Sequence, residues 1–322
     1  MITPPRFASP LDVAHRHFGS AAHLAYATSL EALMAEHQVQ ADVAMVETDP
    51  GPTFTLDTGA GEPVLFVHGT PATSAVWMPL IPHLNDIRAI LVDRPGHGLS
   101  GDFDYRTVPA DAIRDHAVKY LESLLDALDL RSATFVASSY GGLWAMWLAL
   151  DRPERVERLV LAGAPPGMLS PRLPLIFGLL SVPAIAGVMN RMSPPSARAT
   201  RRFFRQMGDP VTHLDETVIQ AFTDAQRLPG AASQLHNIQR AARFPGRFDH
   251  RSLWLDAADL ARITQSTRFL WGPKDFLGDP DHGRRIVDAM PDAELQVIGT
   301  GHLPWLQDPS GVARAVERTL AG

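Results

Sequence analysis

The sequence predicts an α/β protein in which a mostly parallel sheet is covered by helices. Short apolar runs rich in β-branched residues alternate with stretches whose apolar residues recur at helical spacing. This alternation is typical of parallel sheets with helices on both faces. It is interrupted between about residues 165 and 250, where the patterns are helical and rich in proline, arginine and methionine. At 322 residues, the chain is long enough to bury a substantial core.

Six apolar runs predict the strands of the parallel part, and an earlier pair of runs, over residues 42–48 and 52–59, predicts a leading hairpin. Helical patterns separate the strands, and one of them ends before Pro153, as expected from the restriction that proline imposes on the preceding residue. A final helix is predicted over residues 309–320. The six strand runs cover residues 63–69, 89–96, 133–138, 156–164, 267–272 and 293–299.

The pattern divides the chain into three parts. Residues 1–40 form an N-terminal helical segment, and residues 41–164 together with 251–322 form the α/β core. Residues 165–250 are predicted to be a helical cap, inserted before the last two strands. Because this insertion follows a parallel strand, we expect it to cover the carboxyl edge of the sheet.

The most apolar piece of the predicted cap is Leu173 to Met189. It falls short of a membrane span and is interrupted by prolines and glycines, so no stable membrane insertion is expected. Facing water, it would leave a large exposed apolar patch. We therefore expect it to face the carboxyl edge of the sheet, with Leu175, Phe177 and Leu180 lining any binding site at that edge.

The composition of the chain excludes some classes of function. A net charge of −6 and a pI near 6.1 give no electrostatic reason to expect nucleic acid. With no cysteine, thiolate metal sites and cysteine nucleophiles are excluded. No metal-ligand spacing such as H-E-x-x-H is present, and no cofactor is expected. The N-terminus lacks the apolar core of a signal peptide, so the expected location is the cytoplasm, while the sequence leaves the oligomeric state open.

The stretch "VASSYGG" places two serines between a predicted strand and a predicted helix. In the G-x-S-x-G nucleophile elbow, a serine occupies this sharp turn with small residues two positions before and after it. Centred on Ser139, the pattern has Ala137 and Gly141 at these positions. Centred on Ser138, it would need the bulkier Val136 and Tyr140 there. The motif therefore predicts Ser139 as the nucleophile, with helix capping by two ordinary serines as the alternative.

A serine nucleophile needs a base and a group that orients the base. Asp275 follows the run over 267–272, and His302 follows the last strand run, in the chain order serine, acid, histidine. Parallel strands place these loops at one edge of the sheet, so we predict a triad of Ser139, Asp275 and His302. Asp279 and Asp281 are rivals that lie further from the strand end.

The negatively charged oxygen (oxyanion) that forms when a serine attacks a carbonyl also needs hydrogen-bond donors. The elbow supplies the backbone N–H of Tyr140. The loop "HGTPATSAVW" supplies a second donor, for which the Thr70 N–H is the candidate because Gly69 lets the backbone turn sharply, whereas Pro71 has no N–H. His68 lies in the same loop and is expected to orient it.

Five motifs, "FVHGTP", "LVDRPGHGLS", "VASSYGG", "LWGPKD" and "GTGHLPWLQDP", run in order from about residue 60 to the C-terminus. Together they resemble the α/β-hydrolase superfamily, in the branch with haloperoxidases, esterases and C–C hydrolases. The resemblance implies the α/β-hydrolase fold. Its dehalogenases and epoxide hydrolases use aspartate at the elbow, so Ser139 disfavours those activities. The "DRPGHGLS" loop, with Asp93, Arg94, His97 and Ser100, is expected to be a structural support.

The leading hypothesis is a serine hydrolase that cleaves a small-to-medium apolar ester through an acyl-enzyme. A second hypothesis keeps the triad but cleaves a carbon–carbon bond or forms a peracid. A third is a non-catalytic protein of this fold that binds a small ligand. The sequence does not identify the substrate.

Overall fold

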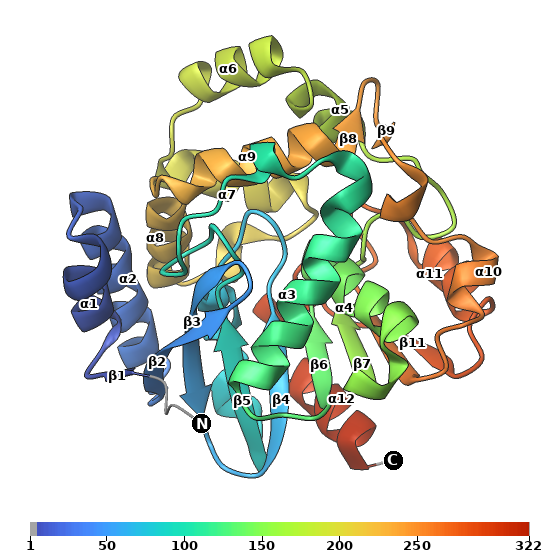
Figure 1. Ribbon diagram of the computed structural model, residues 1–322, viewed down its shortest axis with the longest axis horizontal. Coiled ribbons are helices and arrows are strands. Elements are labelled where there is room, and N and C mark those ends of the chain that lie inside the picture. Colours follow the sequence, from blue (N-terminus) through green and yellow to red (C-terminus); the bar gives the residue numbers. More distant parts are fainter. Residues whose placement is uncertain (1–4, 322) are drawn as a thin grey trace.

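The computed structural model describes residues 5–321, so the first four residues of the predicted N-terminal segment lie outside the described part. Nine strands form one sheet in the order β1-β2-β3-β5-β4-β6-β7-β10-β11 (Figure 1). Along this order, the first three pairings, from β1 to β5, are antiparallel, and all pairings from β5 to β11 are parallel. The mostly parallel sheet predicted from the sequence is confirmed. The strands are β1 (Arg6–Phe7), β2 (Asp42–Thr48), β3 (Gly51–Thr58), β4 (Glu62–Val67), β5 (Ile87–Val92), β6 (Ala133–Ala137), β7 (Val156–Ala162), β10 (Ser266–Trp271) and β11 (Ala293–Val297).

The sheet separates two apolar cores, because successive side chains of a strand point to opposite faces. In β4, Val64 and Phe66 pack into one core, with α2 (Ala21–Glu36), α8 and α12. Leu65 and Val67 pack into the other, with α3, α4 and α11. The N-terminal segment carries α1 (Pro10–Val13) and α2, and the helices of the α/β core are α3 (Ile113–Ala127), α4 (Ser139–Asp151), α10 (Ala257–Leu260), α11 (Pro280–Val287) and α12 (Pro309–Ala321).

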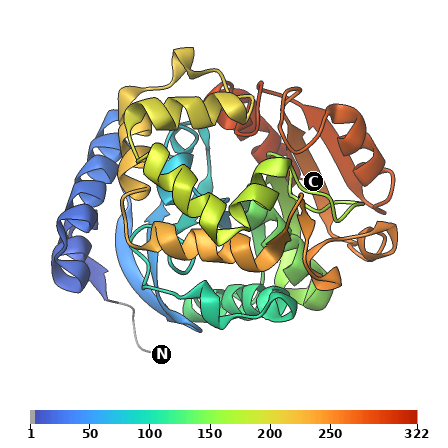
Figure 2. The ribbon, with the colours of Figure 1, turned by 90° about the horizontal axis from the view of Figure 1, so that it is seen from above.

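Residues 165–250, here called the helical insertion, lie between β7 and β10 and carry five helices and a small hairpin. They cover one end of the molecule, and α5 and α6 are the outermost elements there (Figures 1 and 2). The helix α8 also packs on α2, so the insertion contacts the N-terminal segment. The elements are α5 (Leu175–Leu180), α6 (Pro183–Met192), α7 (Ala197–Gln206), α8 (Glu216–Ala225), α9 (Gly230–Ala241), β8 (Ala242–Arg243) and β9 (Arg247–Phe248).

The expected orientation of the Leu173–Met189 piece is wrong in part. Leu173 and Phe177 line a pocket that also contains Ser139, whereas Leu175 is 57% exposed and points away from it. The reason is helical geometry: residues 175 and 177 are two positions apart and lie about 200° apart around the helix axis. One helix face therefore meets the pocket and the other meets solvent.

Gly141, in the first turn of α4, lets this helix approach the loop after β4. A Cβ atom there would lie 2.4 Å from the His68 carbonyl oxygen and 2.6 Å from that of Val67. We expect Gly141→Ala to lower the free energy of unfolding by roughly 1–3 kcal/mol, because backbone must shift to accept the methyl group. Urea unfolding measures this change.

Gly187→Ala in α6 is the matched control, because a Cβ atom there has no neighbour within 4 Å. It is expected to be neutral or stabilising by about 0.5–1 kcal/mol, the ordinary gain of alanine over glycine in a helix. Equal destabilisation by both substitutions would contradict the close approach at Gly141.

Candidate active site

Ser139 occupies a sharp turn between strand β6 and helix α4. Its φ angle is +52°, in the left-handed region that residues other than glycine rarely adopt. The turn lies against the loop after β4: a Cβ atom on Gly69 would be 2.7 Å from the Cβ atom of Ser139. Both Gly69 and Gly141 are therefore needed for the close approach, which is the geometry of a nucleophile elbow.

The two adjacent serines have different surroundings. Ser139 lines the pocket, whereas Ser138 is almost fully buried and its backbone N–H donates to the Val67 carbonyl at 3.0 Å. The hydroxyl of Ser138 is buried and has no hydrogen-bond partner among the described residues. A substrate in the pocket can reach Ser139, but not Ser138.

The two proposed oxyanion donors, Thr70 and Tyr140, line the same pocket as Ser139. Tyr140 is the second residue of α4, where a backbone N–H has no acceptor inside the helix. The Thr70 N–H donates no hydrogen bond to another described residue. Two backbone donors beside Ser139 are thus free to bind a developing negative charge.

The loop after β5 packs against the loop that contains Thr70 and holds it in place. The Asp93 carboxylate accepts the Ser74 N–H at 2.7 Å and the Leu99 N–H at 2.9 Å. Arg94 is fully buried, donates to the Thr70 hydroxyl at 2.6 Å and stacks its guanidinium 4.7 Å from the Trp144 ring centre. These contacts confirm the expected structural role of the "DRPGHGLS" motif.

His68 belongs to this support. Its Nε2 accepts the Arg94 N–H at 3.0 Å, and its Nδ1 donates to the Gly69 carbonyl at 2.7 Å. Burial, reinforced by the Arg94 charge, holds the pKa of His68 well below its usual range. A neutral imidazole with both nitrogens occupied orients the loop and has no free lone pair for proton transfer.

His302 and Asp275 meet after β11 and β10. The His302 Nδ1 lies 2.8 Å from Asp275 Oδ2, and both side chains are buried. Asp275 also accepts the Ala164 and Leu277 N–H groups, each at 2.9 Å, which fixes its carboxylate. Burial alone would lower the pKa of His302, but the Asp275 carboxylate, together with nearby Asp209, outweighs it and raises the pKa.

The rival acids have other partners. Asp279 caps α11 by accepting the His282 N–H at 2.8 Å, and Asp281 pairs with Arg284. In this structure no hydrogen bond between described residues joins His302 to the Ser139 hydroxyl. Such bonds often tighten only when substrate is bound.

The Alpha/beta hydrolase family model matches residues 64–315, most of the chain and all of these loops. The chain belongs to the alpha/beta hydrolase family. It is 30% identical over 259 residues to a 2-hydroxy-6-oxo-6-phenylhexa-2,4-dienoate hydrolase from Burkholderia cepacia, covering 78% of this chain and 84% of that protein. It is 28% identical over 274 residues to the uncharacterized protein Rv2715 of Mycobacterium tuberculosis, covering 81% and 76%.

The α/β-hydrolase fold is also found in solved structures. Carboxylesterase CesB from Bacillus subtilis superimposes with a TM-score of 0.74 and 17% identity, covering 94% of this chain and 99% of that one. The sheet and its flanking helices are thus those of an α/β-hydrolase, as the sequence motifs predicted.

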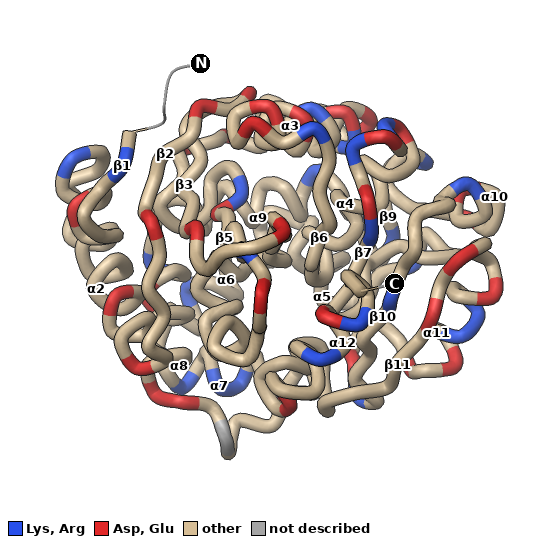
Figure 3. The backbone as a smooth tube through the Cα atoms, turned by 90° about the horizontal axis from the view of Figure 1, so that it is seen from below, with Lys and Arg blue, Asp and Glu red and all other residues tan. Residues whose placement is uncertain are grey.

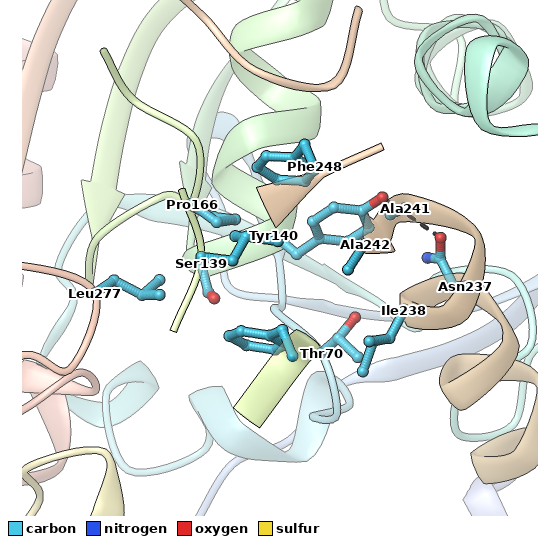
Figure 4. A pocket seen from close by; sticks show the side chains of 12 residues that line it. Thr70, Ser139, Tyr140, Pro166, Asn237, Ile238, Ala241, Ala242, Phe248 and Leu277 are labelled. Carbon is cyan, nitrogen blue, oxygen red and sulfur yellow. Dashed lines mark hydrogen bonds between the residues drawn. The ribbon is translucent and has the colours of Figure 1, made fainter. Parts of the chain in front are cut away.

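The pocket of this α/β-hydrolase lies between the sheet edge and the helical insertion. It has an empty volume of about 480 Å³, part of it open to solvent. Ser139 lies near its centre, with Leu277 on one side and Thr70 and Ile238 on the other (Figure 4). None of its lining residues is charged; they are Thr70, Ser139, Tyr140, Pro166, Leu173, Phe177, Asn237, Ile238, Ala241, Ala242, Phe248 and Leu277.

Aromatic side chains connect this pocket to the histidine. Phe177 lies 6.2 Å from Phe276, measured between ring centres, and Phe276 meets the His302 ring edge-on at 4.9 Å. Trp77 and Trp144 do not line the pocket and are fully buried core residues. Across residues 5–321, no group of three or more histidine or acidic side chains could hold a metal ion, and no helix is long and apolar enough to cross a membrane.

Asp209 is a buried acid that sequence reasoning missed. It lies in the helical insertion, just after α7, and its Oδ1 accepts the Leu303 N–H at 3.1 Å. The neighbouring Met207 carbonyl accepts the His302 N–H at 3.1 Å. Burial raises the pKa of Asp209 to about 7, although the nearby His302 opposes this. A Gly-Asp-Pro sequence is an ordinary turn signal, so no pattern marked this residue.

Asp209 gives the stability of this hydrolase a specific dependence on pH. The folded state keeps the Asp209 proton up to about pH 7, whereas the unfolded chain releases it near pH 3.8. Because the folded state binds more protons in this window, stability falls as pH rises through it. We expect Asp209→Asn to remove this loss, so that the variant gains up to about 4 kcal/mol relative to wild type between pH 4 and pH 8.

Urea unfolding at several pH values measures this difference. Asp129→Asn, which removes an exposed carboxyl group from a residue with φ near +57°, is the control and should follow the wild-type profile. Parallel curves for wild type and Asp209→Asn would contradict the raised pKa.

Proposed function

We propose that this α/β-hydrolase is a serine hydrolase that cleaves small-to-medium apolar esters through an acyl-enzyme. The observation that carries the proposal is the uncharged, mostly apolar pocket that opens directly onto Ser139. The His302–Asp275 pair, buried beside the same sheet edge, supports it. An apolar acyl or alkoxy group would bury its surface there without stranding a charge.

In the proposed reaction, His302 removes the proton from the Ser139 hydroxyl as its oxygen attacks the ester carbonyl. The N–H groups of Thr70 and Tyr140 bind the oxyanion, and Asp275 stabilises the imidazolium. His302 then gives the proton to the departing alcohol. Water, deprotonated by the same histidine, attacks the acyl-enzyme and releases the acid and Ser139.

The same triad could serve carbon–carbon bond hydrolysis, which the name of the Burkholderia cepacia relative describes. That relative's named substrate is a carboxylate, and a buried carboxylate needs a cationic or hydrogen-bonding partner. The residues that line the Ser139 pocket include no cation, which favours the ester. Comparing rates on p-nitrophenyl esters and on 2-hydroxy-6-oxo-6-phenylhexa-2,4-dienoate separates the two candidates.

The proposed nucleophile is tested directly by substitution. Ser139→Ala should lower kcat for p-nitrophenyl butyrate by on the order of a millionfold, because the covalent route is lost. It should also abolish labelling by a fluorophosphonate. Ser138→Ala, one residue away on the buried side, should keep most of the activity. The reverse result would move the nucleophile, and unlabelled wild-type protein would favour the non-catalytic alternative.

The proposed role of the helical insertion in substrate choice is tested at Phe177, which lines the pocket. Phe177→Ala should enlarge the pocket. The kcat/KM for p-nitrophenyl octanoate, divided by the kcat/KM for p-nitrophenyl acetate, should rise roughly tenfold, because each added methylene group can then be buried. Leu175→Ala, on the opposite face of α5, is the control and should leave the ratio unchanged. An equal shift in both variants would contradict the assignment of faces.

A further inference from the structure

The exposed apolar side chains of this protein are concentrated on one surface. Of the six large apolar residues that are exposed among residues 5–321, five lie on the helical insertion. They come from α5, α6 and the loop of the β8–β9 hairpin, which packs on α5. We call this surface the outer face; its residues are Leu175, Ile176, Val188, Met192 and Phe244.

The outer face differs from an ordinary water-facing surface. Val188 and Met192 are four residues apart in α6 and therefore lie on one side of the helix. They are 53% and 81% exposed, and Arg191 is the one charged residue among the ten of this helix. A helix side that faced water alone would carry mostly polar and charged residues.

The charge of the insertion is opposite to that of the rest of the chain. Residues 165–250 contain ten arginines and five acidic residues, a net charge of +5, whereas the remaining residues carry −11. No acidic residue occurs between positions 158 and 208 or between 225 and 248, which includes α5, α6 and the hairpin. Seen from the opposite end, acidic residues of the remaining chain lie on helices such as α3 and α11 (Figure 3).

Three arginines neighbour the outer face along the chain. Arg172 precedes α5, Arg191 lies in the last turn of α6, and Arg247 lies on β9, where its backbone bridges to Arg172. All three are exposed, and none forms an ion pair with another described residue. Aliphatic side chains among unpaired arginines are the pattern by which helices lie on an anionic lipid surface.

From this pattern we propose that the outer face binds the surface of membranes that contain anionic phospholipid. The aliphatic side chains enter the boundary between headgroups and acyl chains, and the arginines contact lipid phosphates. A second copy of the chain fits less well. In a symmetric dimer the same surface meets itself, which would bring the three arginines of each copy together.

Membrane binding at this face places the pocket close to the lipid. Phe177 lines the pocket on the inner side of α5, while Leu175 and Ile176 are exposed on the outer side. One helix diameter, about 10 Å, separates the two sides. If the proposed ester hydrolysis holds, an apolar substrate dissolved in the bilayer would lie about one helix diameter from the pocket that contains Ser139.

Co-sedimentation with vesicles tests the proposal without any assay of catalysis. The full chain should bind vesicles of phosphatidylcholine mixed with phosphatidylglycerol more tightly than vesicles of phosphatidylcholine alone. Added salt should weaken the difference, because exposed charges are screened. Equal binding to both compositions, or no binding to either, would overturn the proposal.

Matched substitutions localise the binding. Val188→Asn should weaken it roughly tenfold, the effect of losing one buried aliphatic side chain. Val297→Asn is the control: Val297 is 48% exposed on β11, outside the outer face, and its substitution should change nothing. Arg191→Gln should weaken binding about fivefold, and Arg314→Gln on α12 should not. Equal losses in a variant and its control would overturn the assignment of the face.

Two further measurements complete the test. Hydrolysis of a water-soluble ester by Val188→Asn at the wild-type rate would show that the variant is folded and that lipid binding and catalysis are separate properties. Sedimentation without vesicles tests whether a second copy of the chain binds the outer face instead. A dimer that Val188→Asn dissociates, in a protein that does not bind anionic vesicles, would show that a second copy covers this face and would refute the proposal.

Discussion

The site depends on the close packing of three backbone segments: the loop after β4, the loop after β5 and the turn that carries Ser139. A residue with a side chain is held at a positive φ angle there, which costs conformational energy that the surrounding structure must offset. The offset comes from the loop after β4, which can approach because positions 69 and 141 have no Cβ atom. That loop is in turn fixed by Asp93 and Arg94. The strained turn, the free N–H groups and the pocket wall are thus parts of one packing arrangement.

Sequence reasoning predicted those features that local chemistry determines. The six parallel strands follow from apolar runs, and the elbow follows from small residues at fixed spacing around Ser139. Predicting that Asp275 and His302 would be neighbours needed one further rule, the shared carboxyl edge of parallel strands. The structure brings these two side chains within 2.8 Å, although they are 27 residues apart in the chain.

The features that the sequence did not predict depend on contacts between distant segments. Strand β1 consists of two residues, too few for a periodic pattern, and exists because β2 offers an edge to pair with. The rotation of α5, which turns Leu175 outward, is set by Phe177 and Gly178 packing against the pocket and the hairpin. The burial of Asp209 could not be predicted for the same reason, because its partner Leu303 lies 94 residues further along the chain.

The contacts of residues 207–209 have a consequence for how this fold can diversify. The helical insertion is an attractive unit to exchange, because it lines the pocket while the loops that carry Asp275 and His302 belong to the core. Here the insertion also holds the loop that carries His302, through the Met207 carbonyl and the Asp209 carboxylate. A Cβ atom on Gly301 would collide with the backbone of Gly208 and Asp209, so the two segments fit each other closely. Grafting a foreign insertion would therefore remove a support of His302 together with part of the pocket wall, unless the graft kept the short turn after α7.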